Sequence, residues 1–180
     1  MIRKARTALA FGLGLAAIAL TAAAGPGDTA ATAKIGEKAP AWKLTDLDGK
    51  THELKDFKGK NVVLEWTNPD CPYIVGVYDK GVVKETVDAM KKMGENFVYI
   101  AVNSTANKAM DDVKKINVDF LKKHEIKLPV VMDYDGKVGK AYGAKRTPHM
   151  FVIDGEGVLR YHGAFTDDQG SRNAPKHTNY

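Results

Sequence analysis

The sequence predicts an α/β protein in which a central mixed sheet is flanked by helices. Two observations support this class. Short apolar runs typical of strands alternate with segments whose apolar residues recur at helical spacing, and the alternation closes in an antiparallel hairpin. A chain of 180 residues with 44% hydrophobic and 27% charged residues suits one globular domain with a short accessory segment.

The first predicted elements lead to a buried strand. Trp42 to Leu54 reads as a hairpin, because Asp48-Gly49 is a turn signal, and a polar connector follows at Asp56 to Lys60. Asn61 to Trp66 is apolar almost throughout, which is typical of a strand covered on both faces. A loop at Thr67 to Asp70 then leads to the next helix.

Residues 73–93 have helical spacing, and Gly76 and Gly81 in their middle favour two shorter helices over one. Phe97 to Asn103 is the next buried strand, and Lys108 to His124 is expected to be a crossover helix. The remaining elements are a strand at Pro129 to Asp133, a short helix at Lys137 to Tyr142, and a hairpin of Met150 to Asp154 with Val158 to Phe165.

Residues 1–33 have the pattern of a secretory signal peptide with a short linker. A basic start precedes the apolar run Ala8 to Leu20, and small residues follow at 22–24 and 31–33. The alternatives are a buried helix or a membrane anchor, but a run of 13 residues is shorter than the roughly 20 that cross a bilayer. We therefore expect a mature protein that lacks its first 24 to 33 residues, is periplasmic or secreted, and has no membrane segment.

The net charge and the single cysteine limit the classes of function that the sequence supports. Residues 34–180 carry a net charge of +3, and their lysines are scattered among acids, so nothing favours nucleic-acid binding. The single cysteine, Cys71, excludes a disulfide within the chain. A leftover thiol in an exported protein is either buried and inert or reactive.

Cys71 is placed where a thiol can become reactive. It follows the loop after the strand at Asn61 to Trp66 and opens a helix, with Pro72 at the first helical position. Free backbone N–H groups and the helix dipole at that position favour the thiolate, whereas the neighbouring Asp70 opposes it. The alternative is a buried, inert cysteine.

Two motifs in this order carry a resemblance to a known family. They are the Cys71-Pro72 helix start after a buried strand and the later run Arg146-Thr147-Pro148-His149 that enters the last hairpin. Over Ile35 to Asp168 the chain resembles the thioredoxin superfamily, and it is similar to exported redoxin-domain proteins of the alkyl hydroperoxide reductase/thiol-specific antioxidant (peroxiredoxin-like) group. The resemblance implies a thioredoxin-like sandwich with an N-terminal hairpin over residues 34–168, then a polar tail at 169–180.

The resemblance also implies roles for particular residues. Cys71 matches the reactive cysteine, and Thr147–Pro148 matches the Thr–cis-Pro pair that lies against it. Glu65 matches a buried carboxylate that accepts a proton; the alternative is a strand-end carboxylate held by hydrogen bonds. The expected substrate-binding residues around the cysteine are Pro72, Asn68, Arg146 and His149.

The chain departs from the family at defined positions. Ile74 stands where a Cys-x-x-Cys motif has its second cysteine, so the dithiol reaction is not available within the chain. Peroxiredoxins have Pro and Thr/Ser where this chain has Leu64 and Asn68, and their arginine aligns with Pro148. Exported relatives commonly continue into a last helix and a cysteine-containing tail, which leaves truncation at Tyr180 open.

The sequence therefore predicts an exported, single-cysteine thiol oxidoreductase without a cofactor. Cys71 would attack a disulfide or a peroxide, and an external thiol partner would resolve the product. The alternative is a non-catalytic thioredoxin-fold binding module. Such a module could bind a soft metal such as copper through Cys71 and His149, although copper-delivering relatives have a second cysteine where this chain has Val75. We expect no metal at the site.

Overall fold

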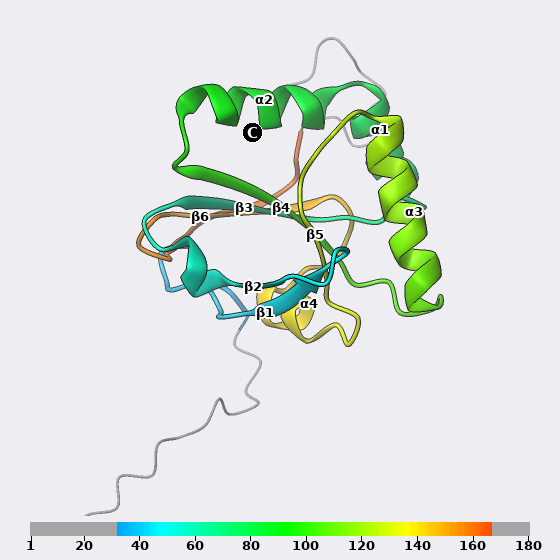
Figure 1. The fold of residues 1–180 in the computed structure, drawn as a ribbon. Coiled ribbons are helices and arrows are strands. Elements are labelled where there is room, and N and C mark those ends of the chain that lie inside the picture. Colours follow the sequence, from blue (N-terminus) through cyan, green and yellow to red (C-terminus); the bar gives the residue numbers. More distant parts are fainter. Residues whose placement is uncertain (1–31, 167–180) are drawn as a thin grey trace, which may run out of the picture.

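A computed structural model describes residues 32–166 as one seven-stranded sheet with helices on both faces (Figure 1). The predicted leader, except for Thr32 and Ala33, and the predicted tail at 169–180 lie outside the described residues. The strand order is β2-β1-β5-β4-β3-β6-β7. This architecture confirms the predicted class, a central mixed sheet flanked by helices.

The strand β3 (Asn61–Trp66) occupies the centre of the sheet. It pairs in parallel with β4 (Phe97–Asn103) and antiparallel with β6 (His149–Ile153), so that Glu65 faces Ala101 on one side and Met150 on the other. The strand β7 (Leu159–Gly163) completes the C-terminal hairpin. Four of the six residues of β3 are buried, as its continuous apolar pattern predicts.

The N-terminal hairpin of β1 (Lys43–Asp46) and β2 (Thr51–Glu53) joins the sheet through β5 (Val130–Met132). Between this hairpin and β3, the chain forms a short 3₁₀ helix at Leu54–Phe57. Its start is a reciprocal capping box, in which the Asp56 carboxylate accepts a hydrogen bond from the Glu53 backbone N–H at 2.9 Å. The sequence indicated only a polar connector here.

Three helices cover one face of the sheet: α1 (Pro72–Asp79), α2 (Val82–Met93) and α3 (Met110–Lys123). Figure 1 shows α1 and α2 above the sheet and α4 (Lys137–Tyr142) below it. The predicted division into two helices is confirmed, because Gly81 adopts a positive φ of 74° between α1 and α2. None of the described helices is long and apolar enough to span a membrane.

The two faces of the sheet bury two separate hydrophobic clusters because side chains alternate along β3. Leu64 and Trp66 pack with Phe151 and Tyr142 on the face that α4 covers. The cluster under α1 and α2 contains residues from both helices and from the sheet, namely Ile74, Val77, Tyr78, Val82, Val83, Val87, Tyr99, Ile126, Met150 and Phe165, with Cys71 packed against it. Cys71 and Trp66 therefore pack on opposite faces of the sheet.

Candidate active site at Cys71

A tight turn after β3 delivers Cys71 to the start of α1. The Cys71 backbone N–H donates to the Asn68 carbonyl at 2.8 Å, and the Asp70 N–H donates to the Asn68 side-chain oxygen at 2.9 Å. The Cys71 carbonyl then accepts the first helical bond from Val75. With Pro72 at the first helical position, Cys71 is the N-cap residue, as the sequence predicts. Asn68 therefore stabilises the turn that positions Cys71.

The loop before β6 places Thr147 directly against the cysteine. The half-buried Cys71 Sγ donates to the Thr147 carbonyl oxygen at 3.3 Å, and the Thr147–Pro148 peptide bond is cis. Only the thiol can make this bond, because a thiolate has no proton to donate. The bond therefore stabilises the thiol, whereas the free N–H groups of the helix start stabilise the thiolate.

An ion pair lies beside the cysteine that the sequence did not reveal. The Lys108 ammonium is 2.6 Å from the Asp70 carboxylate, so the charge expected to oppose a thiolate is compensated. Lys108 belongs to the loop between β4 and α3, which the Tyr134 hydroxyl holds through a hydrogen bond to the Lys108 carbonyl at 2.9 Å. The partners are 38 positions apart in the sequence, so no local sequence pattern indicates this pair.

A buried carboxyl group lies beneath α1. Glu65 is fully buried, and its Oε2 accepts hydrogen bonds from Tyr99 at 2.5 Å and Tyr78 at 3.2 Å. Its Oε1 has no hydrogen-bond partner within residues 32–166. Burial raises the pKa of Glu65 to about 7, although hydrogen bonds from Tyr99, Tyr78 and Thr67 act in the opposite direction. Glu65 can therefore take up or release a proton near neutral pH.

The position of a second thiol is filled by a hydrocarbon side chain. Ile74 has no exposed surface and packs in the cluster beneath α1 and α2 together with Tyr78. Cys71 is therefore the one thiol available at this helix start, since the chain has a single cysteine. Any disulfide formed at Cys71 must join it to another molecule.

The structure does not bring every expected residue to the sulfur. His149 packs against Phe151 with ring centroids 4.5 Å apart, on the face of the sheet that α4 covers, so it does not join Cys71 in a metal site. Burial, assisted by the positive charges of Arg146, His162 and Lys145, lowers the pKa of His149 to about 4. Pro72 directly follows the cysteine and Arg146 directly precedes Thr147, and both are exposed. Residues 32–166 hold no group of three His, Cys, Asp or Glu side chains suited to a metal ion.

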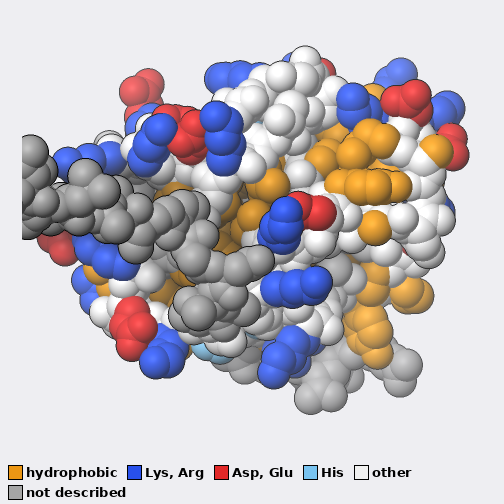
Figure 2. Space-filling view, turned by 90° about the horizontal axis from the view of Figure 1, so that it is seen from below, with side chains coloured by type: hydrophobic (Ala, Val, Ile, Leu, Met, Phe, Trp, Pro, Cys, Tyr) orange, Lys and Arg blue, Asp and Glu red, His pale blue; other side chains and the backbone are white. Residues whose placement is uncertain are grey.

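A cavity of about 490 Å³ lies away from Cys71, at the end of α3 and the start of β5. Its walls include Leu121, Ile126, Leu128 and Pro129, with Asp46 from the N-terminal hairpin. Figure 2 shows hydrophobic side chains gathered toward the right of the lower face, the side on which α3 lies in Figure 1. This cavity shares no lining residue with the environment of Cys71.

Comparison with known proteins agrees with the fold. The sequence model of the Redoxin family matches residues 34–177. A thiol-disulfide oxidoreductase named ResA from Bacillus thuringiensis subsp. konkukian is 34% identical over 133 residues, which cover 70% of this chain and 67% of that protein. ResA of Bacillus subtilis is 32% identical over 132 residues, with 69% and 64% covered.

Similar solved structures also include thiol–disulfide exchange proteins and thioredoxins. A putative thiol:disulfide interchange protein DsbE from Chlorobium tepidum is 25% identical with a TM-score of 0.59, covering 74% of this chain and 86% of that one. An exposed lipoprotein thioredoxin from Streptococcus pneumoniae is 28% identical with a TM-score of 0.55, covering 69% and 88%. The predicted thioredoxin-like sandwich is thus confirmed, and the chain belongs to the Redoxin family of the thioredoxin superfamily.

Proposed function

We propose that the protein is an exported thiol oxidoreductase that works through a single cysteine. The observation that carries this proposal is the environment of Cys71, whose sulfur lies at the start of α1 and against the Thr147 carbonyl at 3.3 Å. The similarity to proteins named thiol-disulfide oxidoreductases supports the same chemistry. The pattern of residues 1–33 supports export, and the relationship to an exposed lipoprotein thioredoxin agrees with it.

The reaction is an exchange of one disulfide for another. The Cys71 thiolate attacks one sulfur of a substrate disulfide, so that a new Sγ–S bond forms while the old S–S bond breaks. The second substrate sulfur leaves as a thiolate and takes a proton from water. An external thiol then attacks the mixed disulfide and releases Cys71, because Ile74 offers no sulfur for this step.

Glu65 is the group on this face that can accept the thiol proton. Its pKa of about 7 leaves a substantial ionised fraction at neutral pH, and it lies under α1 with one oxygen free of partners among the described residues. The Tyr78 hydroxyl connects it to the same helix that begins at Cys71. The proposal assigns Glu65 a proton-transfer role and Thr147 and Pro148 the role of contacting the reacting sulfur.

Peroxide is a second candidate substrate because the same thiolate would attack it and form a sulfenic acid. The chain lacks the Thr/Ser of peroxiredoxins at Asn68 and their arginine at Pro148. We therefore expect oxidation by hydrogen peroxide to be faster than for a free cysteine but slower than for a peroxiredoxin. Disulfides are the preferred substrate class.

The proposal is tested on protein without its leader. Incubation with hydroxyethyl disulfide should give a mixed disulfide at Cys71, seen as a mass increase, and iodoacetamide should alkylate Cys71 faster than a free cysteine at pH 7. Catalytic reduction of insulin should not occur. Cys71→Ser should lose every reaction and keep its fold. Alkylation no faster than that of a free thiol would replace this proposal with a non-catalytic binding module.

A gain of function tests the missing thiol directly. Ile74→Cys restores the Cys-x-x-Cys spacing, so the variant should form an internal disulfide and reduce insulin catalytically. Removing two methylene-sized groups from this buried position should cost about 1–2 kcal/mol of folding stability. The matched control is Cys71→Ser/Ile74→Cys, which has the same core change and should stay inactive. An inactive, folded Ile74→Cys variant would show that Cys71 is not positioned for exchange.

A further inference from the structure

The segment that carries Thr147 to the cysteine also carries two positive charges. Lys145 and Arg146 are both exposed, and they directly precede Thr147, whose carbonyl oxygen is 3.3 Å from Cys71 Sγ. Since consecutive Cα atoms are about 3.8 Å apart, Arg146 begins within about 10 Å of the sulfur and Lys145 one residue further. That is close to the Debye length of about 8–10 Å at moderate salt, so these charges act on a molecule bound at the sulfur.

Within residues 32–166, the carboxyl groups near Cys71 are Asp70, which Lys108 compensates, and Glu65, which is buried beneath α1. Neither Lys145 nor Arg146 forms an ion pair within residues 32–166, whereas Asp70 is already paired with Lys108 at 2.6 Å. The first turn of α1 contains no acidic residue. The free N–H groups of this helix start add further positive potential. The exposed positive charge near the sulfur therefore lies on the cis-proline loop, at Lys145 and Arg146.

The segment of Lys145 and Arg146 lies against the end of the strand that follows Pro148. Arg146 and Lys145 both contribute, after burial, to the lowered pKa of His149, the residue that follows Pro148. The Lys145 backbone N–H also approaches His149 Nδ1 at 3.4 Å, which keeps the loop folded back toward the strand. This contact keeps the backbone of the segment next to Pro148.

We infer that Cys71 reacts preferentially with disulfides and thiols that carry carboxylates beside their sulfur, and that Lys145 and Arg146 determine this specificity. The inference rests on the proposed function, because it names the substrate class of the same site. Cys71 attacks one substrate sulfur, a new Sγ–S bond forms as the old S–S bond breaks, and the carboxylates of the half that stays bound to Cys71 lie near Lys145 and Arg146. The thiolate that leaves takes its proton from water.

The size of the effect follows from the charges. At about 10 Å in water, one unit charge changes the local concentration of a unit-charged reagent about twofold. Two cations therefore favour an anionic reagent about fourfold and disfavour a cationic one by the same factor. The unscreened preference for an anionic over a cationic disulfide, relative to a free thiol, is therefore about sixteenfold; residual screening at low salt should reduce it to about tenfold, and higher salt should reduce it further.

The experiment compares three probes that differ in charge. Glutathione disulfide is anionic, hydroxyethyl disulfide is neutral and cystamine is cationic. Initial rates of mixed-disulfide formation at Cys71 are measured by mass spectrometry at about 10 mM and about 500 mM ionic strength, each divided by the rate of N-acetylcysteine amide. We expect a normalised ratio of glutathione disulfide to cystamine of about ten at low salt, falling toward one at high salt.

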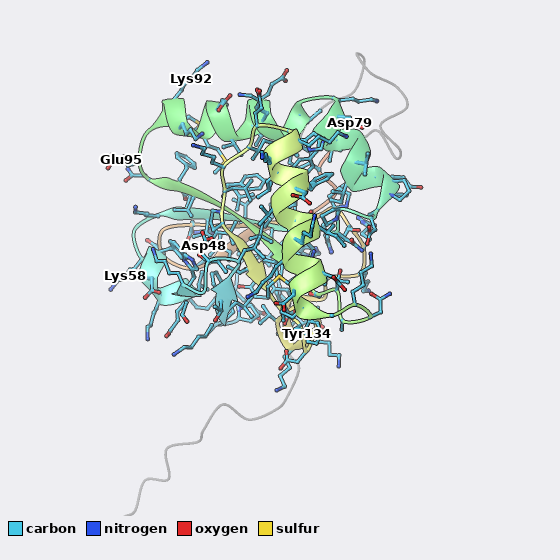
Figure 3. The ribbon with its side chains drawn as sticks, turned by 45° about the vertical axis from the view of Figure 1, so that its right-hand side comes forward. Asp48, Lys58, Asp79, Lys92, Glu95 and Tyr134 are labelled. Carbon is cyan, nitrogen blue, oxygen red and sulfur yellow. The ribbon has the colours of Figure 1, made fainter. Side chains whose placement is uncertain are left out.

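Lys145→Gln/Arg146→Gln should lower the low-salt ratio to about two. The matched control is Lys58→Gln/Lys92→Gln, which removes the same net charge from exposed positions; Figure 3 shows both lysines at the left of the molecule, while α1 lies at the right. The control should keep the wild-type ratio. A wild-type ratio near one, a ratio unaffected by salt, or a control that matches the loop variant would overturn the inference. Failure to react even with hydroxyethyl disulfide would instead overturn the proposed function.

Discussion

Two buried carboxyl groups, one on each side of the sheet, have opposite surroundings. Asp133 has no exposed surface, and its oxygens accept bonds from the Val138 N–H at 3.0 Å, the Gly139 N–H at 2.8 Å and Ser104 Oγ at 2.8 Å. Glu65 is equally buried; its Oε2 accepts hydrogen bonds from two tyrosine hydroxyls, and its Oε1 has no partner within the described residues.

The difference lies in bonding, since both groups are fully buried. Asp133 fixes the start of α4 and connects through Ser104 to the indole of Trp66. Glu65 keeps one oxygen without a partner in the described part of the chain, so its charged form is poorly solvated and its pKa rises to about 7. Asp133 has hydrogen-bond donors for both of its oxygens, so its role is structural. Glu65 lacks a donor for one oxygen within the described residues, so it can exchange protons near neutral pH.

The largest loss of folding stability is expected on substitution of Asp133. Asp133→Asn replaces one acceptor oxygen with an amide that faces hydrogen-bond donors, so buried donors lose their partner. We expect a loss of about 3–5 kcal/mol in the free energy of unfolding, measured by urea titration at pH 7. Asp135→Asn, an exposed change on the same loop, is the control and should cost far less stability than Asp133→Asn. A comparable loss in both variants would remove the structural role of Asp133.

The second effect concerns the pH dependence that Glu65 introduces. Its pKa is about 7 in the folded protein against 4.5 for an ordinary glutamate, so the folded state binds more protons between these values. Stability contributed by this group is therefore complete below pH 4.5 and falls as the pH rises to about 7, by about 3 kcal/mol. Urea titrations of wild type and Glu65→Gln from pH 4.5 to 7.5 should diverge by this amount. Parallel curves would show that Glu65 titrates normally.

A smaller effect of opposite sign belongs to His149 on the other face. Its pKa is lowered from 6.5 to about 4, so the unfolded state binds the proton first as the pH falls through 6.5. Stability from His149 is then complete above pH 6.5 and is lost toward pH 4, by about 2 kcal/mol once solvent screening is allowed for. Between pH 4.5 and 6.5 it opposes Glu65. Glu65→Gln should therefore become more stable with rising pH in this window, and adding His149→Gln should abolish that slope.

The smallest effect separates the two tyrosines that bind Glu65. Tyr99→Phe removes the 2.5 Å bond and Tyr78→Phe the 3.2 Å bond, so the first should raise the pKa of Glu65 further and cost about 1 kcal/mol more at pH 7.5. Tyr142→Phe, whose hydroxyl bonds the Pro40 carbonyl on the other face, should leave the pH profile unchanged. Equal profiles for Tyr99→Phe and Tyr78→Phe would mean that the two bonds act alike.

Local patterns in the sequence were sufficient for the elements and for the position of the cysteine. The short helix at Lys137–Tyr142 and the strand at Asn61–Trp66 have the bounds that the sequence predicts, because glycine and apolar periodicity mark them locally. The helix start at Cys71 is equally local, since a proline at the first helical position identifies it. The Redoxin resemblance agrees with the family match over residues 34–177.

Pairings across the sheet were not predictable in the same way. Tyr99 lies 34 residues from Glu65, and Lys108 lies 38 residues from Asp70, so only the folded chain shows that they meet. The attachment of β1 to β5 is likewise a long-range pairing without a local signal. A glutamate within an apolar strand did indicate that Glu65 needs partners, but nothing in the sequence identified tyrosines as those partners.

The lone thiol at the start of α1 also makes the unmodified protein its own spectroscopic tool. A maleimide dye can attach only at Cys71, so no cysteine has to be removed before labelling. Trp66 is buried five residues earlier and Trp42 lies in the same cluster, so both can serve as energy-transfer donors to that dye. Emission from a labelled sample would then report how far the start of α1 lies from these tryptophans as the protein unfolds, without any engineered probe site.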